Sequence, residues 1–348
     1  MIFTFILLLF LIVSCIFLEE YLGVYRKYVY GAICVVFILY SGLRPIGVDP
    51  DSEAYESIFM SNSGSSKMLI EHSFLMIVQF FRTFSDDVHV LFLFYAILGI
   101  GIKFYALRRL SPWYFLPLVI YFGNYYILHD YIQIRAGVSS AMLLLAIKPL
   151  SDGNRKNAFF CFMIATLFHY SSLVFLPILF FRNELSKLWR YILIGIVPVG
   201  VLLFILHYDF FSAIPIPYIQ DKIEMYKSLA ETGIFEELSL KSPFIWIQYI
   251  IIIYSLCFYD TMHEYCPSLP LLLKITAYSM ACFFAFSSIS VVASRLHDML
   301  GVVEIVLFPC VIYTIRPDYY GKAVVCLIGI IEFVFTLFIW DLLDFKMA

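Results

Sequence analysis

The chain has 348 residues, a formal net charge of −3 at pH 7, 62% hydrophobic residues and only 14% charged residues. Soluble domains carry about 25% charged residues, so this composition excludes an ordinary soluble globular domain. No basic block or stacking platform of the kind used for nucleic-acid binding is present in the sequence. The composition is typical of a helical protein that crosses a membrane several times.

Apolar runs recur along the whole chain, with short polar breaks between them. A membrane span needs about 20 residues, so the runs predict an all-α polytopic membrane protein with about 11–12 transmembrane helices, some of them short or broken. The first run has no Lys or Arg and lacks the charged start of a signal peptide, which favours an uncleaved span. We expect one integral membrane domain over 1–348, with spans at 2–18, 28–43, 88–107, 112–129, 132–150, 157–181, 188–207, 242–259, 269–290, 296–315 and 323–342.

The eight cysteines show no paired spacing of the kind that holds a metal ion. Seven of them fall inside apolar runs, where cysteine behaves as a small hydrophobic residue. The sequence therefore predicts neither a structural disulfide nor a zinc site.

Two polar intervals, 44–87 and 208–241, are too long to be simple turns. The first contains an apolar-rich helix near 69–84 that starts with Glu71, and this helix is predicted to lie at the membrane interface. The second contains an amphipathic pattern over 218–230, which is typical of a helix on the membrane surface. Both intervals are expected to be external loops.

Basic residues in the short breaks set the predicted orientation, because Lys and Arg are enriched on the cytoplasmic side. If all of these groups are cytoplasmic, the run 157–181 must begin and end on the same side of the membrane. A hairpin of two short helices that turns at His169 satisfies this condition, whereas a single span would invert the later topology. The groups are Arg26/Lys27, Lys103/Arg108/Arg109, Lys148/Arg155/Lys156, Arg182/Lys187/Arg190 and Arg316/Lys322.

With the hairpin, the candidate functional residues meet at the external face although they are far apart in the sequence. A membrane enzyme that acts on a lipid headgroup there would have this arrangement. We expect catalytic roles for Asp49 and His169, and no metal. The expected substrate-binding residues are Arg44, Asp51, Arg135, Arg295 and His297.

Structural roles remain open for each candidate. Arg44 and Arg295 could be interfacial anchors, Asp49 and Asp51 could form a turn, and His169 could be a satisfied core histidine. The Asp-Pro-Asp spacing alone is weak evidence for a metal pair.

Two charged residues inside apolar runs need partners. Arg135 lies within an apolar span, so it requires an anion, either Asp130 as a structural partner or a phosphate as a functional one. Glu304 lies deep in a late span, where it could pair with Arg295 or Lys274.

Five short motifs together resemble the EpsG-like group of Wzy-type polysaccharide polymerases, in the order of that family. They reach from about 40 to 308, most of the chain, and the polar pair His297-Asp298 departs from the family pattern. The motifs are Gly42-Leu43-Arg44 with Gly47-x-Asp49 and Tyr55, Glu71-His72-Ser73-Phe74, Ile134-Arg135-Ala136-Gly137-Val138, Phe168-His169-Tyr170-Ser171-Ser172-Leu173 with Pro177, and Ser294-Arg295-Leu296.

The resemblance implies a polymerase that joins undecaprenyl-diphosphate-linked oligosaccharide repeat units, at the external face of the cytoplasmic membrane. It implies no cofactor, and it implies a lipid-linked donor and acceptor with a possible flippase and chain-length regulator as partners. Arg135 and Arg295 would bind the diphosphate, with Arg44 as a weaker third. Asp49 is the first candidate for the general base and His169 the second. A related membrane glycosyltransferase, an O-antigen ligase and a lipid-linked oligosaccharide transporter remain as alternatives.

Overall fold

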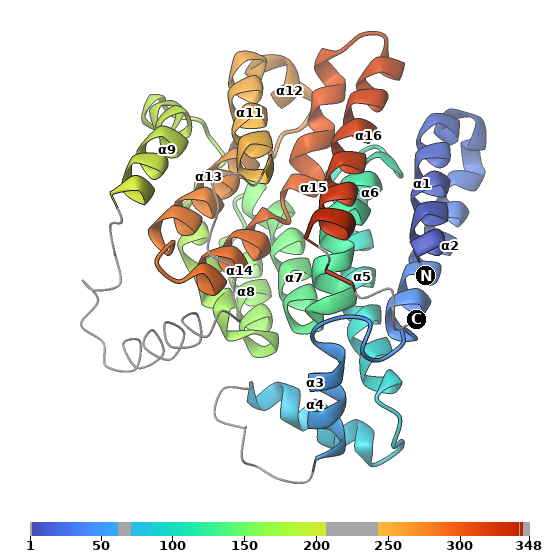
Figure 1. Ribbon diagram of the computed structural model, residues 1–348. Coiled ribbons are helices and arrows are strands. Elements are labelled where there is room, and N and C mark those ends of the chain that lie inside the picture. The colour runs from blue at the N-terminus through green and yellow to red at the C-terminus, as the bar shows by residue number, and fades with distance from the viewer. Residues whose placement is uncertain (1, 62–70, 207–242, 341, 344–348) are drawn as a thin grey trace.

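A computed structural model describes residues 2–61, 71–206, 243–340 and 342–343 of the chain. These residues form helices joined by short connections, and no strand occurs in the described ranges (Figure 1). The all-α polytopic fold expected from the sequence is therefore confirmed. The amphipathic helix expected at 218–230 lies outside the described residues.

The first two helices form an antiparallel pair at one edge of the bundle (Figure 1). Helix α1 (Ile2–Leu22) and helix α2 (Arg26–Gly42) are joined by the short helix η1 (Gly23–Tyr25). The rings of Phe5 and Tyr40 lie 5.1 Å apart between centroids, which requires the chain to reverse between the two helices. Gly23 permits the reversal because its φ of +50° is one that other residues rarely adopt.

Each predicted span corresponds to a helix or a broken pair of helices. Helices α3 (Ser52–Met60) and α4 (His72–Arg82) fill the first polar interval. The remaining elements are α5 (His89–Leu110), α6 (Leu116–Ile120), η3 (Tyr121–Ile132), α7 (Ile134–Ser151), α8 (Arg155–Phe168), η4 (Tyr170–Phe180), α9 (Lys187–Ile205), α11 (Pro243–Cys257), α12 (Tyr259–Tyr265), α13 (Leu269–Ala285), α14 (Ser290–Gly301), α15 (Glu304–Leu307), η6 (Phe308–Thr314), α16 (Asp318–Val334) and η7 (Phe335–Ile339).

By length and hydropathy, 5 helices of the described chain could each cross a membrane, or up to 7 if each bent pair counts as one span. This number is below the 11–12 expected because several segments are short or interrupted. Helix α13 has only 17 residues, and α6 changes at Tyr121 into a wider helix of π type. In this number α1 and α2 also count as one continuous helix, Ile2–Gly42.

The predicted hairpin at His169 is present. The rings of Phe162 in α8 and Phe175 in η4 lie 5.6 Å apart between centroids. Thirteen residues of straight helix would separate them by about 20 Å, because each residue adds about 1.5 Å. The chain therefore turns back at His169, and the hairpin is confirmed by this contact.

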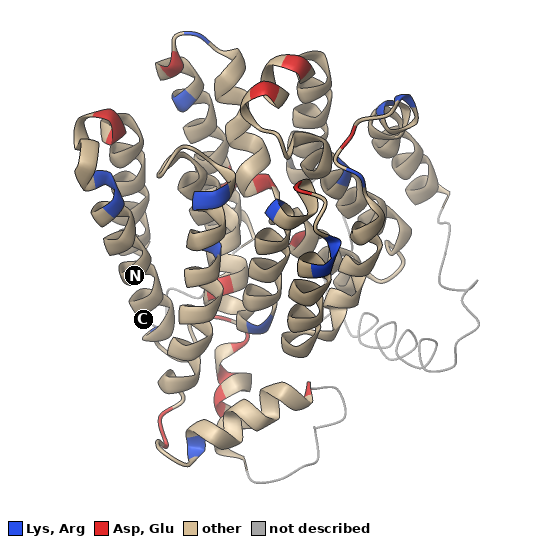
Figure 2. Ribbon diagram, turned by 180° about the vertical axis from the view of Figure 1, so that it is seen from behind, with Lys and Arg blue, Asp and Glu red and all other residues tan. Residues whose placement is uncertain are grey.

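Because the chain turns back at His169, the two ends of the bundle carry different groups. The basic groups in the short connections lie mostly towards the upper end, whereas α3 and α4 lie across the opposite end (Figures 1 and 2). Helix α4 packs Phe74 and Val78 inward and leaves Met76 and Phe80 exposed. An outward apolar face suits a helix at the membrane interface, and which side of the membrane this end faces stays a prediction.

A buried ion pair connects the three central elements α5, η3 and α7. Lys103 Nζ lies 2.9 Å and 2.7 Å from the two carboxylate oxygens of Asp130, and it also donates to the carbonyl oxygen of Gly137 at 2.8 Å. The hydroxyl of Tyr121 donates to Asp130 Oδ2 at 2.7 Å. A Cβ atom at Gly99 or Gly137 would collide with the Asp130 carboxylate, so glycine is needed at both positions.

One of the two anions left open for Arg135 is excluded here, because a partner from a distant part of the chain overrides local spacing. Asp130 pairs with Lys103 and does not provide the anion for Arg135. Lys103 is one of the basic residues used to predict the orientation, and its side chain is 0% exposed inside the bundle.

We expect Lys103→Met to lower the stability of the purified protein strongly, because it leaves Asp130 buried without its counterion. Loss of one partner of a buried pair costs about 3–5 kcal/mol. The matched control is Lys148→Met, since Lys148 and Asp152 form a pair that is 39% and 51% exposed and should contribute less than about 1 kcal/mol. The thermal unfolding midpoint in detergent measures both, and equal midpoints would contradict a stabilising role for the buried pair.

Candidate functional site

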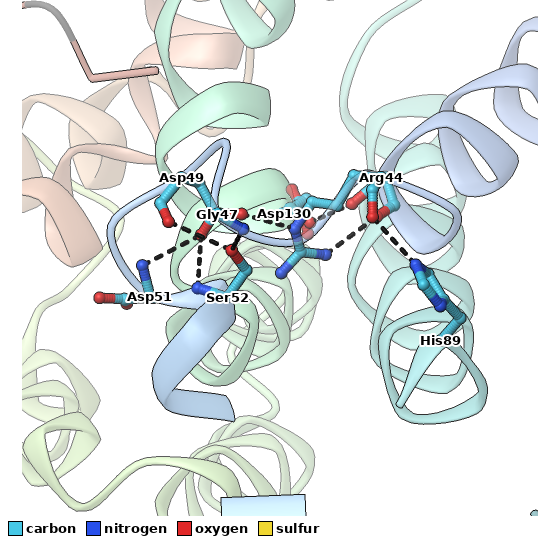
Figure 3. Close-up of polar contacts among 8 residues, drawn as sticks. Arg44, Gly47, Asp49, Asp51, Ser52, His89 and Asp130 are labelled. Carbon is cyan, nitrogen blue, oxygen red and sulfur yellow. Dashed lines mark hydrogen bonds and ion pairs between the residues drawn. The ribbon is translucent and has the colours of Figure 1, made fainter. Parts of the chain in front are cut away.

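The loop after α2 is organised around an ion pair between Arg44 and Asp49 (Figure 3). Arg44 Nε donates to Asp49 Oδ2 at 2.9 Å, and Arg44 Nη1 donates to the carbonyl oxygen of Ser41 at 2.9 Å. Asp49 Oδ1 accepts from the backbone N–H groups of Asp51 and Ser52 at 3.1 Å and 2.9 Å. The pair therefore fixes the path of the chain from α2 into α3.

Arg44 and Asp49 are both enclosed by these contacts. Arg44 is 1% exposed and Asp49 is 4% exposed. The guanidinium Cζ of Arg44 lies 3.9 Å from the centre of the Phe92 ring, and His89 Nε2 lies 3.1 Å from the Arg44 carbonyl oxygen. Because neither charged group presents surface to a ligand, the turn that was one interpretation of this segment describes it well.

Asp51 differs from its neighbour. Its carboxylate points away from the Arg44–Asp49 pair (Figure 3) and remains partly exposed. Burial raises the pKa of Asp51; Asp49 adds to this rise, whereas Arg295 and Arg135 act in the opposite direction. The charges of two arginines from different helices, α7 and α14, therefore act on Asp51.

A second cluster forms around Glu71, the residue immediately before α4. The carboxylate of Glu71 accepts a hydrogen bond from Arg135 Nη1 through Oε2. Its other oxygen, Oε1, lies 2.8 Å from His169 Nδ1 and accepts from the backbone N–H of Tyr170 at 3.3 Å. One carboxylate therefore connects the start of α7 with the turn of the α8–η4 hairpin.

The Glu71 contacts strongly favour its ionised form. Burial raises the pKa of Glu71, but the hydrogen bond to His169 and the charge of Arg135 outweigh this effect and lower the pKa to about 2. The side chain is only 3% exposed, so the carboxylate is stable there because both partners are present.

Arg135 and His169 retain accessible surface despite their bond to Glu71. Their side chains are 23% and 15% exposed. His169 Nε2 makes no hydrogen bond with any residue in the described ranges, and Arg135 Nε is buried without a partner among the same residues. Aromatic rings pack beside the guanidinium, with Phe74 5.3 Å and Tyr55 5.8 Å from Arg135 Cζ to the ring centre.

Arg295 completes this end of the bundle from α14. It is exposed and makes no ion pair or direct hydrogen bond with the described part of the chain, apart from its electrostatic coupling to Asp51. We refer to Asp51, Glu71, Arg135, His169 and Arg295 as the end cluster. It contains two arginines with accessible surface, a histidine held by a carboxylate, and a free carboxylate.

His297 and Glu304 lie elsewhere. His297 is 7% exposed and points inward, with Nε2 2.9 Å from Gln248 Oε1. Glu304 accepts from the Tyr125 hydroxyl at 2.8 Å and does not pair with Arg295 or Lys274, the two partners considered from the sequence. Lys274 instead donates to two backbone carbonyl oxygens, those of Arg182 and Glu184.

The model of the EpsG family matches residues 27–347 of the chain. The chain belongs to the EpsG family. No curated protein and no solved structure matches it. The resemblance found in the short motifs is thereby confirmed at the level of the family.

Sequence reasoning found most residues of the end cluster in this EpsG-family chain, but it did not assign Glu71 a role in the site. Glu71 was noted as the start of an interfacial helix and as part of the motif Glu71-His72-Ser73-Phe74, but no partner was assigned to it. The signal that could have found it is the unpaired Arg135 in an apolar span, which requires an anion close by.

Among the described residues, no group of three or more His, Cys, Asp or Glu side chains is placed to hold a metal ion.

We expect Glu71→Gln to loosen α4, because the neutral amide loses the ionic bond to Arg135 and weakens the bond to His169. Hydrogen–deuterium exchange of the backbone in α4 should become faster in this variant. Glu53→Gln is the matched control, since Glu53 is exposed on α3 in the same loop. Equal exchange in Glu71→Gln and the wild type would show that Glu71 does not anchor the helix.

The same contact predicts an acid transition. A carboxylate whose pKa is lowered in the folded protein stabilises it above the ordinary value of about 4.3, and this stabilisation is lost as the pH falls towards the folded value. Protection of α4, corrected for the intrinsic pH dependence of exchange, should therefore fall between pH 4.3 and about 2. The Glu71→Gln variant should lack this transition, and a wild-type transition centred above pH 5 would contradict the assignment.

Proposed function

We propose that this EpsG-family protein is a polysaccharide polymerase that joins undecaprenyl-diphosphate-linked oligosaccharide repeat units into long glycan chains. The product would be O-antigen, capsule or exopolysaccharide. The reaction would take place at the external face of the cytoplasmic membrane, which in this proposal is the end of the bundle that carries α3 and α4.

One observation carries the proposal: Glu71 holds Arg135 and His169 together at one end of the bundle. The charge of Arg295 acts on Asp51 near this position. A glycosyl transfer from a lipid diphosphate needs positive charge for the leaving group and a base for the acceptor hydroxyl. The end cluster contains both kinds of group.

The arginines suit the leaving group. When the bond between the anomeric carbon and the phosphate oxygen breaks, negative charge develops on the departing undecaprenyl diphosphate. Arg side chains stabilise such charge because they stay protonated and bind phosphate oxygens in a planar, two-pronged geometry. Arg135 and Arg295 have this role in the proposal, while Arg44 supports the loop from its buried position.

His169 is the stronger candidate for the base. Its Nδ1 faces Glu71 Oε1, which fixes the ring and leaves Nε2 as the acceptor of a proton. The acceptor hydroxyl would give its proton to Nε2 as its oxygen bonds to the anomeric carbon. Asp49, the first candidate from the sequence, accepts three hydrogen bonds inside its loop. Asp51 would orient the acceptor sugar next to Arg295.

The position of the arginines favours a transferase over a transporter. A transporter of the lipid-linked oligosaccharide would need polar groups along a path between the two faces, often in related halves. Arg135 and Arg295 instead lie at the same end of the bundle. An O-antigen ligase shares the leaving-group chemistry, so the polymerase and the ligase are separated by their products.

We expect Arg135→Ala to abolish long glycan chains in cells that contain a normal level of the protein. Loss of one preorganised donor to a developing charge lowers a rate by about 10²–10³-fold. Arg109→Ala is the matched control, because Arg109 is exposed at the other end of α5. The glycan ladder on a gel is the measurement, and full-length polymer in the Arg135→Ala strain would overturn the assignment.

We expect His169→Ala to reduce polymerisation by about 10²–10⁴-fold, the usual contribution of a general base. The readout also separates polymerase from ligase. Loss of polymerase activity leaves single repeat units on the lipid core, whereas loss of ligase activity leaves no glycan on the core. A core without any repeat unit in the His169→Ala strain would therefore favour the ligase.

A further inference from the structure

Two carboxylic acids lie deep inside the bundle, away from the end cluster. Glu304 at the start of α15 and Glu332 in α16 are each 1% exposed. Both oxygens of Glu332 and the Oε1 atom of Glu304 are buried without a direct hydrogen-bond partner among the described residues. The two side chains are close enough to interact electrostatically. Lys103 and Asp130 neutralise each other, but no cation of the described chain pairs with Glu304 or Glu332 at ion-pair distance.

The helix that carries Glu304 is broken at this point. Helices α14 and α15 are bent by 41° at the break between Gly301 and Glu304. Broken helices inside membrane bundles leave backbone groups free, and they occur where the backbone is enclosed by protein or lines a polar site. Gly301 is part of the geometry, because a Cβ atom there would lie 2.7 Å from the Tyr125 hydroxyl and 3.4 Å from Glu304 Oε1.

Polar side chains extend from this site towards α14 and α11. The Tyr125 hydroxyl donates to Glu304 Oε2 at 2.8 Å, and the Gln248 amide lies beside the same carboxyl group. Gln248 Oε1 is 2.9 Å from His297 Nε2, and His297 Nδ1 is 3.4 Å from Asp298 Oδ1. Asp298 is 26% exposed, so the row of polar groups reaches the surface.

We propose that Glu304 and Glu332 form an intramembrane proton-binding site, connected to the surface through Gln248, His297 and Asp298. The ligand is a proton on each carboxyl group. This inference is independent of the proposed glycosyl transfer.

The free-energy cost of burying charge favours the protonated carboxyl groups over the ionised ones. An unpaired carboxylate in apolar surroundings costs several kcal/mol, whereas the neutral acid costs far less. The groups that face the pair are Tyr125 from η3, Gln248 from α11 and Asp298 from α14, and none of them carries a positive charge. A bound proton therefore neutralises each carboxylate, because no cationic side chain of the described residues does so.

A carbodiimide tests the proposal without any measurement of activity. Dicyclohexylcarbodiimide dissolves in membranes and reacts with carboxyl groups that are protonated and in apolar surroundings. Purified full-length protein should gain the reagent at Glu304 or Glu332, located by peptide mass spectrometry, and the extent of labelling should fall as the pH rises. The variants Glu304→Gln and Glu332→Gln should each lose the adduct at the substituted position. They should keep the wild-type unfolding midpoint, since the amide resembles the protonated acid.

Asp130 is an internal control in every sample, because it is also buried but forms an ion pair with Lys103 and should not react. His297→Leu tests the connection to the surface, and it should slow the change in labelling after a pH jump. The proposal is overturned if folded protein is not labelled at either glutamate. It is also overturned if labelling is independent of pH, or if sodium ions protect the site at constant pH, which would make the ligand a metal cation.

Discussion

Lys103 and Asp130 lie among apolar side chains with almost no exposed surface, and neither could remain charged there without the other. Their contacts hold α5, η3 and α7 together, with Gly99 and Gly137 making space for the carboxylate. The end cluster depends on this arrangement, because Arg135 is at the start of α7, directly after η3. The accessible charges of the end cluster thus depend on an ion pair that has almost no accessible surface.

The same requirement for neutralisation distinguishes two kinds of charged residue in this chain. Arg44 and Asp49 satisfy each other within six residues of sequence and become part of a turn. Arg135 and His169 are satisfied by Glu71, which is 64 residues from the one and 98 from the other. The second arrangement keeps accessible surface on both partners, and the binding role proposed for the end cluster requires such surface.

The spans and the hairpin at His169 could be predicted from the sequence, because hydrophobic run length and the position of basic residues are local properties. The partners of buried charges could not. Asp130 was one of two anions left open for Arg135, on a spacing of five residues, but its partner in the structure is Lys103, 27 residues away on a neighbouring helix. Glu71 was recognised as a polar helix start and as part of a motif, but for the same reason not as the partner of Arg135 and His169. The order of the motifs indicated the EpsG family, although it did not show which acidic side chain pairs with which basic one.

The reversal at His169 also has a consequence for how the chain can change in evolution. Each helical segment reverses the direction in which the chain runs through the bundle. One additional segment, such as η4, therefore reverses the direction of every later segment. Loss of η4 alone would move Arg295 to the end of the bundle opposite Arg135, although no residue near either arginine had been replaced. Helical segments of this protein can therefore be gained or lost only in pairs if Arg135 and Arg295 are to stay at the same end of the bundle.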